Sequence, residues 1–221
     1  MKVLIMAAPR TGSTSLMHNL SITAGFSFKH EPYNHEFKPG NVPHGLDFSF
    51  LDTLNDDVIV KSMVGQIPIG EEDSIDFLLK FMKWADYTIL LSRRNKQEHL
   101  ESWVNLWHKI NRIPKSQKHT QINGQWWISD IEDILPQFNY NEEGPDGYPS
   151  LRFYTDRVEE ISKILNHPIT YYEDLYSSDF NTRVSTFKSL NLPNTFDSME
   201  LARKSNPQRK YRTTLPKGGI I

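Results

Sequence analysis

Blocks of apolar residues alternate with polar segments along this chain, and their spacing predicts strands and helices in turn. A continuous apolar run is typical of a strand buried in a parallel sheet, and one stands at 3–7; further strands are expected at 25–30, 57–63, 86–94 and 168–175. Apolar residues at helical spacing predict helices at 13–24, 73–84, 96–110, 151–165 and 181–192. Gly25 is expected to end the first helix, and Asp73 to cap the second.

The alternation of strands with helices of about 10–15 residues predicts βαβ units. We therefore expect an α/β fold with three layers, in which helices cover both faces of a central parallel sheet. We expect a single domain over 1–221. Ligands of such sheets bind beyond the carboxyl ends of the strands, so the loops at 8–13, 30–35, 61–66, 92–97 and 172–177 are the candidate site.

Composition narrows the class of protein. The 221 residues are 38% hydrophobic and 24% charged, with a net charge of −2, so we expect a globular domain without a general nucleic-acid-binding surface. The chain has no cysteine, which excludes disulfides, thiol catalysis and cysteine-bound zinc. The apolar run 3–8 is too short for a signal peptide, and no stretch matches a membrane span. We expect a cytoplasmic protein, with no metal in its chemistry.

The loop after the first strand has the form of a phosphate-binding loop. The Walker A pattern G-x-x-x-x-G-K-[ST] aligns with Ala7 to Thr14, but Ala7 replaces the first glycine and Ser13 replaces the lysine. Gly12 permits the turn, and the amides of 12–15 begin a helix whose positive end attracts an anion. Arg10 supplies charge from the other side of the loop. A strand–turn–helix that binds no ligand is the simpler interpretation of the loop alone.

The segment "PRTGSTSL" resembles the 5′-phosphosulfate loop of sulfotransferases, which use 3′-phosphoadenosine 5′-phosphosulfate (PAPS). The family loop reads roughly P-[RK]-[ST]-G-[ST]-[ST]-x-L, and this chain fills it with Pro9, Arg10, Thr11, Gly12, Ser13, Thr14 and Leu16. The resemblance implies a PAPS-dependent enzyme with a fold like that of P-loop nucleotide-binding proteins, in which residues 9–15, including Ser15, bind the cofactor. It covers roughly 1–110 and 150–205 and says little about 111–150.

Two further segments carry the resemblance. Arg94 and Ser102 have the spacing of the arginine and serine that bind the 3′-phosphate of PAPS in the family, with Arg93 as a less favoured substitute. Lys96 stands where the family often has proline. "YEDL" at 172–175 resembles the segment near the adenine, so Tyr172 is a candidate for stacking on the base. Without the resemblance, Arg94 and Ser102 would be interpreted as part of a solvated charge cluster at the end of a strand. Tyr172 would be interpreted as a strand end that leads into a turn.

Sulfuryl transfer requires a cation for the leaving phosphate and a base for the acceptor proton. Lys61 matches a lysine that many family members have after the third strand, and Arg10 is the other candidate cation. Met63 stands where many members have the histidine base. Other branches use a glutamate after the second strand, which favours Glu31 as the base, with His30 second. Alternation along a strand predicts these two side chains on opposite sides.

The remaining segments give weaker predictions. We expect 111–150, with Trp126 and Trp127, to be an acceptor-side insertion or lid for a small-molecule or glycan acceptor. The irregular basic tail from Arg203, including Lys204 and Arg209–Lys210, is a candidate to fold over the cofactor. Two alternatives stay open: a P-loop kinase that uses ATP and magnesium, and a nucleotide-binding module without catalysis. The sequence does not indicate the oligomeric state.

Overall fold

A computed structural model describes residues 1–34, 47–66, 75–109, 119–122, 125–128, 135–144 and 148–205, with backbone alone at 107–109, 119–122 and 125–128. The elements in chain order are β1 (Lys2–Ala7), α1 (Ser13–Ala24), β2 (Ser27–His30), the 3₁₀ helix η1 (Phe48–Thr53), β3 (Val58–Met63), α2 (Ile75–Trp84), β4 (Tyr87–Ser92), α3 (Lys96–Lys109), β5 (His119–Ile122), β6 (Gln125–Ile128), the 3₁₀ helix η2 (Leu135–Gln137), α5 (Leu151–Leu165), β7 (Ile169–Tyr171), α6 (Tyr172–Leu175), α7 (Phe180–Ser189) and α8 (Ser198–Lys204). The predicted cap Asp73, the side chains of Trp126 and Trp127, and the tail beyond 205 lie outside the described residues.

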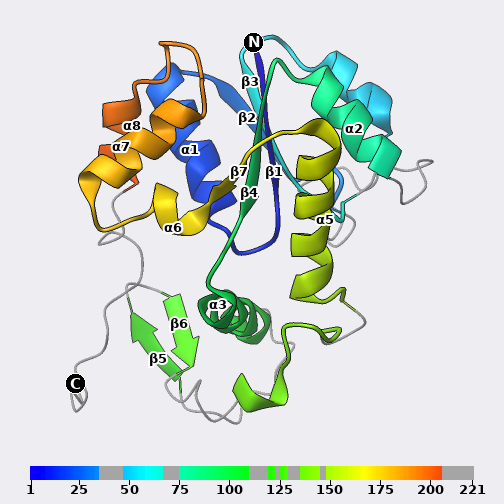
Figure 1. The fold of residues 1–221 in the computed structure, drawn as a ribbon, viewed down its shortest axis with the longest axis vertical. Helices are drawn as coiled ribbons and strands as arrows, with labels where there is room; N and C mark the ends of the chain where they lie inside the picture. Colours follow the sequence, from blue (N-terminus) through cyan, green and yellow to red (C-terminus); the bar gives the residue numbers. More distant parts are fainter. Residues whose placement is uncertain are drawn as a thin grey trace.

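Five strands form one parallel sheet in the order β2-β3-β1-β4-β7 (Figure 1). The central strand β1 pairs with β3 and β4, so that Ile5 stands beside Lys61 on one side and Ile89 on the other. Because all five strands run the same way, their carboxyl ends meet at one edge. The predicted α/β fold is confirmed, with a P-loop-like strand–loop–helix unit at its centre.

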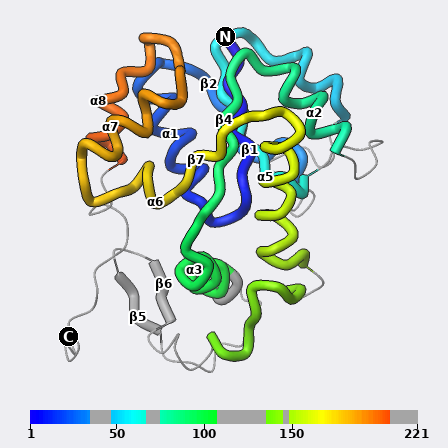
Figure 2. The backbone as a smooth tube through the Cα atoms, in the orientation of Figure 1, coloured from blue at the N-terminus to red at the C-terminus, as the bar shows by residue number. Residues whose placement is uncertain are grey.

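Helices cover both faces of the sheet, and alternate residues of β1 point into two separate cores. Helices α1, α7 and α8 pack on the face that carries Val3, Ile5 and Ala7. Helices α2, α3 and α5 pack on the face that carries Leu4 and Met6. The tube in Figure 2 shows these two helical layers on either side of the strands, with α3 lying beyond the carboxyl end of β4. The three-layer prediction is therefore correct.

Most helix boundaries follow from local chemistry. Gly25 ends α1 in the left-handed conformation, with φ of 72°, as the sequence predicts. The side chains of Ser150, Asp179 and Asp197 accept hydrogen bonds from the first amides of α5, α7 and α8 respectively. No helix in the described part of the chain is long and apolar enough to cross a membrane.

Two predicted segments differ from the structure. The strand predicted at 168–175 covers only Ile169–Tyr171, because Tyr172–Leu175 turns into the short helix α6. The tail predicted to be irregular from Arg203 begins inside α8, which ends at Lys204. Within the predicted insertion 111–150, β5 and β6 form an antiparallel hairpin whose backbone packs beside α3.

Candidate functional site

The loop between β1 and α1 contains two residues in the left-handed region, separated by Thr11. Arg10 has φ of 59° and Gly12 has φ of 77°, while the Thr11 hydroxyl donates to the carbonyl oxygen of Ala8 at 2.8 Å. No side chain among the described residues caps α1 at Gly12. The first amides of α1 therefore remain available to an anion at the positive end of the helix dipole.

Gly12 is also required by its surroundings. A Cβ at this position would lie 2.5 Å from Cε2 of Tyr176 and 3.0 Å from Cδ2 of Tyr172. The Tyr176 hydroxyl donates to the carbonyl oxygen of Gly12 at 2.9 Å, and burial raises the pKa of this phenol. The two tyrosines thus form the back wall of the loop. Tyr172 has further neighbours, because its ring lies 4.8 Å from that of Tyr176 and 4.3 Å from the Arg93 guanidinium.

Arg10 reaches across the loop to α3. Its Nε donates to Ser102, at 3.0 Å to the carbonyl oxygen and 3.1 Å to Oγ. Arg10 is exposed at its surface, but desolvation by the surrounding protein, followed by the charge of Arg93, lowers its pKa. Ser102, which the sequence analysis placed with Arg94 at the 3′-phosphate, contacts Arg10 in the structure.

The two arginines after β4 have different surroundings. Arg94 is half-exposed, pairs with Asp174 and places its guanidinium 4.5 Å from the Tyr171 ring. Arg93 is buried and pairs with Glu98 at 2.8 Å and with Glu173 at 3.7 Å. Arg93 therefore connects α3 to α6, whereas Arg94 lies at the surface, where an incoming anion would compete with Asp174 and solvent.

A buried carboxylate and a buried lysine meet directly at the ends of β2 and β3. Glu31 Oε1 contacts Lys61 Nζ, and both side chains are nearly inaccessible to solvent. The Glu31 amide continues the strand pairing by donating to the carbonyl oxygen of Lys61 at 2.7 Å. Glu31 has φ of 50°, an uncommon conformation for a residue with a side chain. Burial and the charge of Arg10 lower the pKa of Lys61 to about 7.

The second oxygen of Glu31 is held by two amides that the sequence analysis missed. Glu31 Oε2 accepts from Asn34 Nδ2 at 2.8 Å and from Gln66 Nε2 at 3.0 Å, and all three residues are buried. Their signal in the sequence is position alone, because Asn34 and Gln66 follow within a few residues of the ends of β2 and β3. The amides fix the carboxylate so that its other oxygen faces Lys61.

His30 lies beside Glu31 rather than on the opposite side. Its Nε2 is 3.6 Å from Glu31 Oε1 and 3.1 Å from the Thr14 hydroxyl. The predicted separation of the two side chains is wrong, because Glu31 lies past the end of β2 in a left-handed turn, where strand alternation no longer applies. Burial, with the charges of Lys61 and His18, lowers the pKa of His30 to about 4, so that the ring is neutral at pH 7.

Lys204 lies away from this cluster. Its Nζ donates to the Thr23 hydroxyl at 3.1 Å and pairs with Glu200 at 2.6 Å. Thr23 is near the carboxyl end of α1, about 15 Å along the helix from the loop at a rise of about 1.5 Å per residue. The structure therefore does not bring Lys204 to the phosphate loop.

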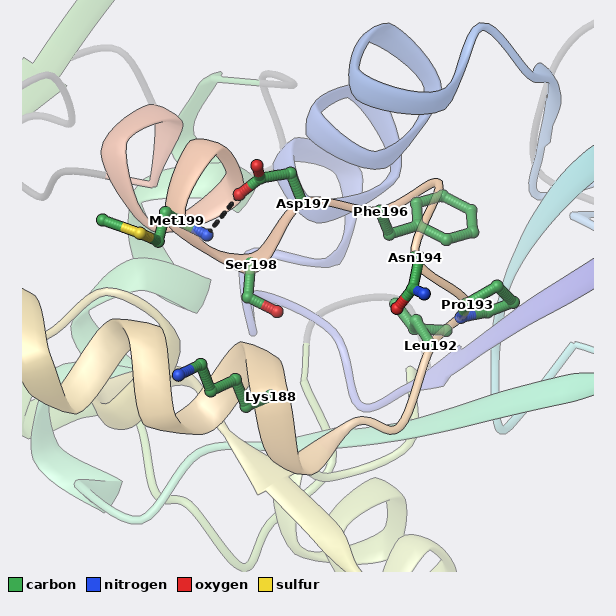
Figure 3. A pocket seen from close by; sticks show the side chains of 8 residues that line it. All are labelled: Lys188, Leu192, Pro193, Asn194, Phe196, Asp197, Ser198 and Met199. Atoms are coloured by element: carbon green, nitrogen blue, oxygen red, sulfur yellow. Dashed lines mark hydrogen bonds between the residues drawn. The ribbon is translucent and has the colours of Figure 1, made fainter.

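Two other features bear on what binds here. No group of three or more histidine and acidic residues in the described part of the chain is arranged to hold a metal ion. A surface hollow of about 350 Å³ lies between the end of α7 and the start of α8, lined among others by Lys188, Asn194 and Met199 (Figure 3). None of its lining residues belongs to the loops that follow the strands, so it is separate from the candidate site.

Comparison with known proteins leaves the family open. No family model matches the chain, and neither does any curated protein. Among solved structures, a gluconokinase from Sinorhizobium meliloti 1021 is 11% identical over 75% of this chain and 95% of its own, with a TM-score of 0.30. A sugar kinase from Janibacter sp. HTCC2649 is 13% identical over 77% of this chain and 98% of its own, also with a TM-score of 0.30. Similarity at this level assigns neither a family nor an activity to the chain.

Proposed function

We propose that the chain is a sulfotransferase that moves a sulfuryl group from PAPS to a hydroxyl or amine of a small-molecule or glycan acceptor. One observation carries the proposal. Glu31, Lys61 and Arg10 come together near the uncapped amino end of α1. The loop that precedes this helix has Ser13 in place of the Walker lysine. Transfer of a sulfuryl group needs a cradle for the anion, charge for the leaving oxygen and a base for the acceptor.

The residues take distinct roles in this proposal. The amides of residues 12–15 and the guanidinium of Arg10 bind the 5′-phosphosulfate. Lys61 stabilises the phosphate oxygen that leaves as its bond to sulfur breaks. Glu31 takes the acceptor's proton as the new bond to sulfur forms, with Asn34 and Gln66 holding its other oxygen. Because Lys61 Nζ contacts Glu31 Oε1, the lysine has to turn toward the leaving oxygen before Glu31 can act as a base.

Residues farther from the phosphate loop bind the rest of the nucleotide and the acceptor in this proposal. Arg94 receives the 3′-phosphate of the nucleotide, exchanging its contact with Asp174 for a doubly charged anion. Tyr172 flanks the base from the back wall of the loop. The hairpin β5–β6 lies beside α3, which itself contacts the loop through Ser102, and this supports an acceptor-side role for 111–150.

A kinase is the second candidate, since the same sheet and helix terminus also suit ATP. A P-loop kinase would need a lysine at position 13 and an acidic residue near the end of β3 or β4 to hold magnesium. The chain has Ser13 in the loop, and Ser62 and Ser92 at those strand ends. These residues favour metal-free binding of a nucleotide with two separate phosphate groups. A module without catalysis would bind the same nucleotide but would not turn it over.

We expect 3′-phosphoadenosine 5′-phosphate (PAP) to bind without divalent metal, because Arg10 and Arg94 supply the charge that magnesium provides in kinases. Isothermal titration calorimetry with PAP and with ATP, each with and without magnesium, measures this preference. Binding of PAP that is unchanged by magnesium supports the proposal. Heat that appears only with ATP and magnesium together assigns the site to a kinase instead.

Replacing Arg94 with alanine is expected to weaken PAP much more than adenosine 5′-phosphosulfate, because only PAP carries the 3′-phosphate. The loss of a charge-assisted contact costs about 1.5–3 kcal/mol, or roughly 10- to 150-fold in affinity. Calorimetry with both ligands gives the ratio. Arg152→Ala, an exposed arginine on α5 that pairs with Asp156, is the charge-matched control and should change neither affinity. Equal weakening of both ligands by Arg94→Ala would make Arg94 a structural residue.

A further inference from the structure

His99 is a buried histidine that the proposed chemistry does not use. It lies on α3 with no exposed surface, and its Nε2 is 2.6 Å from the carbonyl oxygen of Pro9 in the phosphate loop. Its other nitrogen, Nδ1, is 3.3 Å from the hydroxyl of Tyr140, which follows η2. The Tyr140 hydroxyl lies in turn 3.4 Å from Oγ1 of Thr155 on α5. This row of side chains connects the loop to two elements beyond α3.

The neighbours of the ring determine where its proton resides. A carbonyl oxygen only accepts hydrogen bonds, so Nε2 must carry the hydrogen and donate to Pro9. Nδ1 is then left with a lone pair, so the one hydrogen of the Tyr140 hydroxyl has two acceptors within reach, Nδ1 at 3.3 Å and Thr155 Oγ1 at 3.4 Å. Burial lowers the pKa of His99 to about 4, and the nearby charge of Arg93 acts in the same direction, so the ring is neutral at pH 7. The Pro9 carbonyl therefore selects the tautomer that donates to the loop, and a hydrogen bond from the Tyr140 hydroxyl to Nδ1 adds to this preference.

The contact acts on one particular peptide bond. In a trans peptide the carbonyl oxygen and the following amide hydrogen point in opposite directions, so holding the Pro9 oxygen toward α3 turns the Arg10 amide away from α3. Arg10 is in the left-handed region at φ 59°, which an arginine adopts only when its surroundings hold it there. One turn further along α3, Ser102 accepts from the Arg10 side chain. Helix α3 thus holds both the backbone and the side chain of the loop.

We propose that His99 is a positioning residue of the anion site: its Nε2–H fixes the Pro9–Arg10 peptide, and with it the direction of the Arg10 amide and guanidinium. Tyr140 supports this role by keeping the hydrogen on Nε2. The inference rests on the proposed function only in naming PAP as the nucleotide. The fixed peptide faces the 5′-phosphate, so His99 affects recognition of that group and not of the 3′-phosphate.

Nitrogen-15 NMR of the histidine ring tests the contact without any ligand. At pH 7 the ring of His99 is expected to be neutral, with hydrogen on Nε2, and Tyr140→Phe should increase the share of the Nδ1–H tautomer. A ring that carries its hydrogen on Nδ1 in the parent protein would overturn the proposal. A tautomer that is unchanged when the Tyr140 hydroxyl is removed would overturn the supporting role of Tyr140 and leave the Pro9 carbonyl as the group that fixes the proton.

Calorimetry with three nucleotides tests the consequence. His99→Leu is expected to weaken PAP and adenosine 5′-monophosphate by about tenfold or more, as a buried carbonyl loses its donor, and to leave adenosine 3′-monophosphate unchanged. His99→Gln keeps an N–H donor at similar reach and should restore most of the affinity. Val158→Ala, in the core formed by α5, is the control for a general loss of packing and should affect no ligand.

The outcomes separate positioning from simple stabilisation. Weakening of the 3′-monophosphate to the same degree, or the same losses in Val158→Ala, would reduce His99 to a packing residue. Failure of glutamine to restore binding would also refute the role of the N–H donor. If the parent protein binds no PAP at all, the proposed function fails, while the NMR result still decides whether His99 holds the loop.

Discussion

Replacing Glu31 with glutamine is expected to slow sulfuryl transfer by about 10²–10⁴-fold, the range typical for loss of a general base. Glutamine keeps the shape of the side chain and its contacts with Asn34 and Gln66 but cannot accept a proton. PAP binding should stay close to that of the parent, because Glu31 is not assigned to the nucleotide. The rate is measured as release of PAP from PAPS, using whichever phenol, sugar or amine the parent enzyme sulfates.

The choice of pH matters for this experiment. Glu31→Gln leaves Lys61 buried without its carboxylate, which destabilises the folded protein while the lysine is charged. The pKa of Lys61 is lowered to about 7, far below that of the unfolded chain, so the folded state loses this proton first as the pH rises. Stability of the variant should therefore increase from pH 6 to pH 8, and pH 8 is the better condition for the rate measurement.

His30→Asn is the matched control for the base. The His30 ring contacts Thr14 and lies near Glu31 Oε1, so its loss should change the rate by less than the loss of the carboxylate. An inactive His30→Asn together with an active Glu31→Gln would make His30 the base. If both variants keep the parent rate, neither residue removes the acceptor proton, and the search moves to residues 111–150.

The sequence predicts the scaffold well because its signals are local and strong. The apolar run of β1 is buried on both faces of the sheet, and Gly25 supplies the left-handed residue that ends α1. Our sequence analysis did not predict α8, although Asp197 and Glu200 have the spacing that is typical of the start of a helix. The β-branched and aromatic residues at 169–172 favour a strand, but the chain turns into α6 after only three of them.

The sequence predicts which loops form the candidate site, but it does not predict which side chains contact each other there. Loops that follow parallel strands gather at one edge, so Arg10, Glu31 and Lys61 were expected to be close. The contacts between these side chains depend on how the helices pack against the loops, and the spacing of residues along the sequence does not determine that packing. Ser102 lies eight positions after Arg94 but bonds to Arg10, because α3 contacts the loop that follows β1. His99 resembles an ordinary buried residue of an apolar helix face until the Pro9 carbonyl is seen beside it.

Replacing Lys61 with methionine is expected to destabilise the protein by about 3–5 kcal/mol, the usual cost when one partner of a buried ion pair is removed. Methionine has a similar length and keeps the packing, so the loss arises mainly from the Glu31 carboxylate left without its cation. Urea unfolding followed by circular dichroism measures the free energy. The double variant Lys61→Met/Glu31→Gln has no unpaired charge and retains the amide contacts of Asn34 and Gln66, so it should recover most of the loss, and a double-mutant cycle with Glu31→Gln gives the coupling energy. A cost below about 1 kcal/mol for Lys61→Met, the value typical of an exposed pair, would mean that the two charges do not meet in the folded protein in solution.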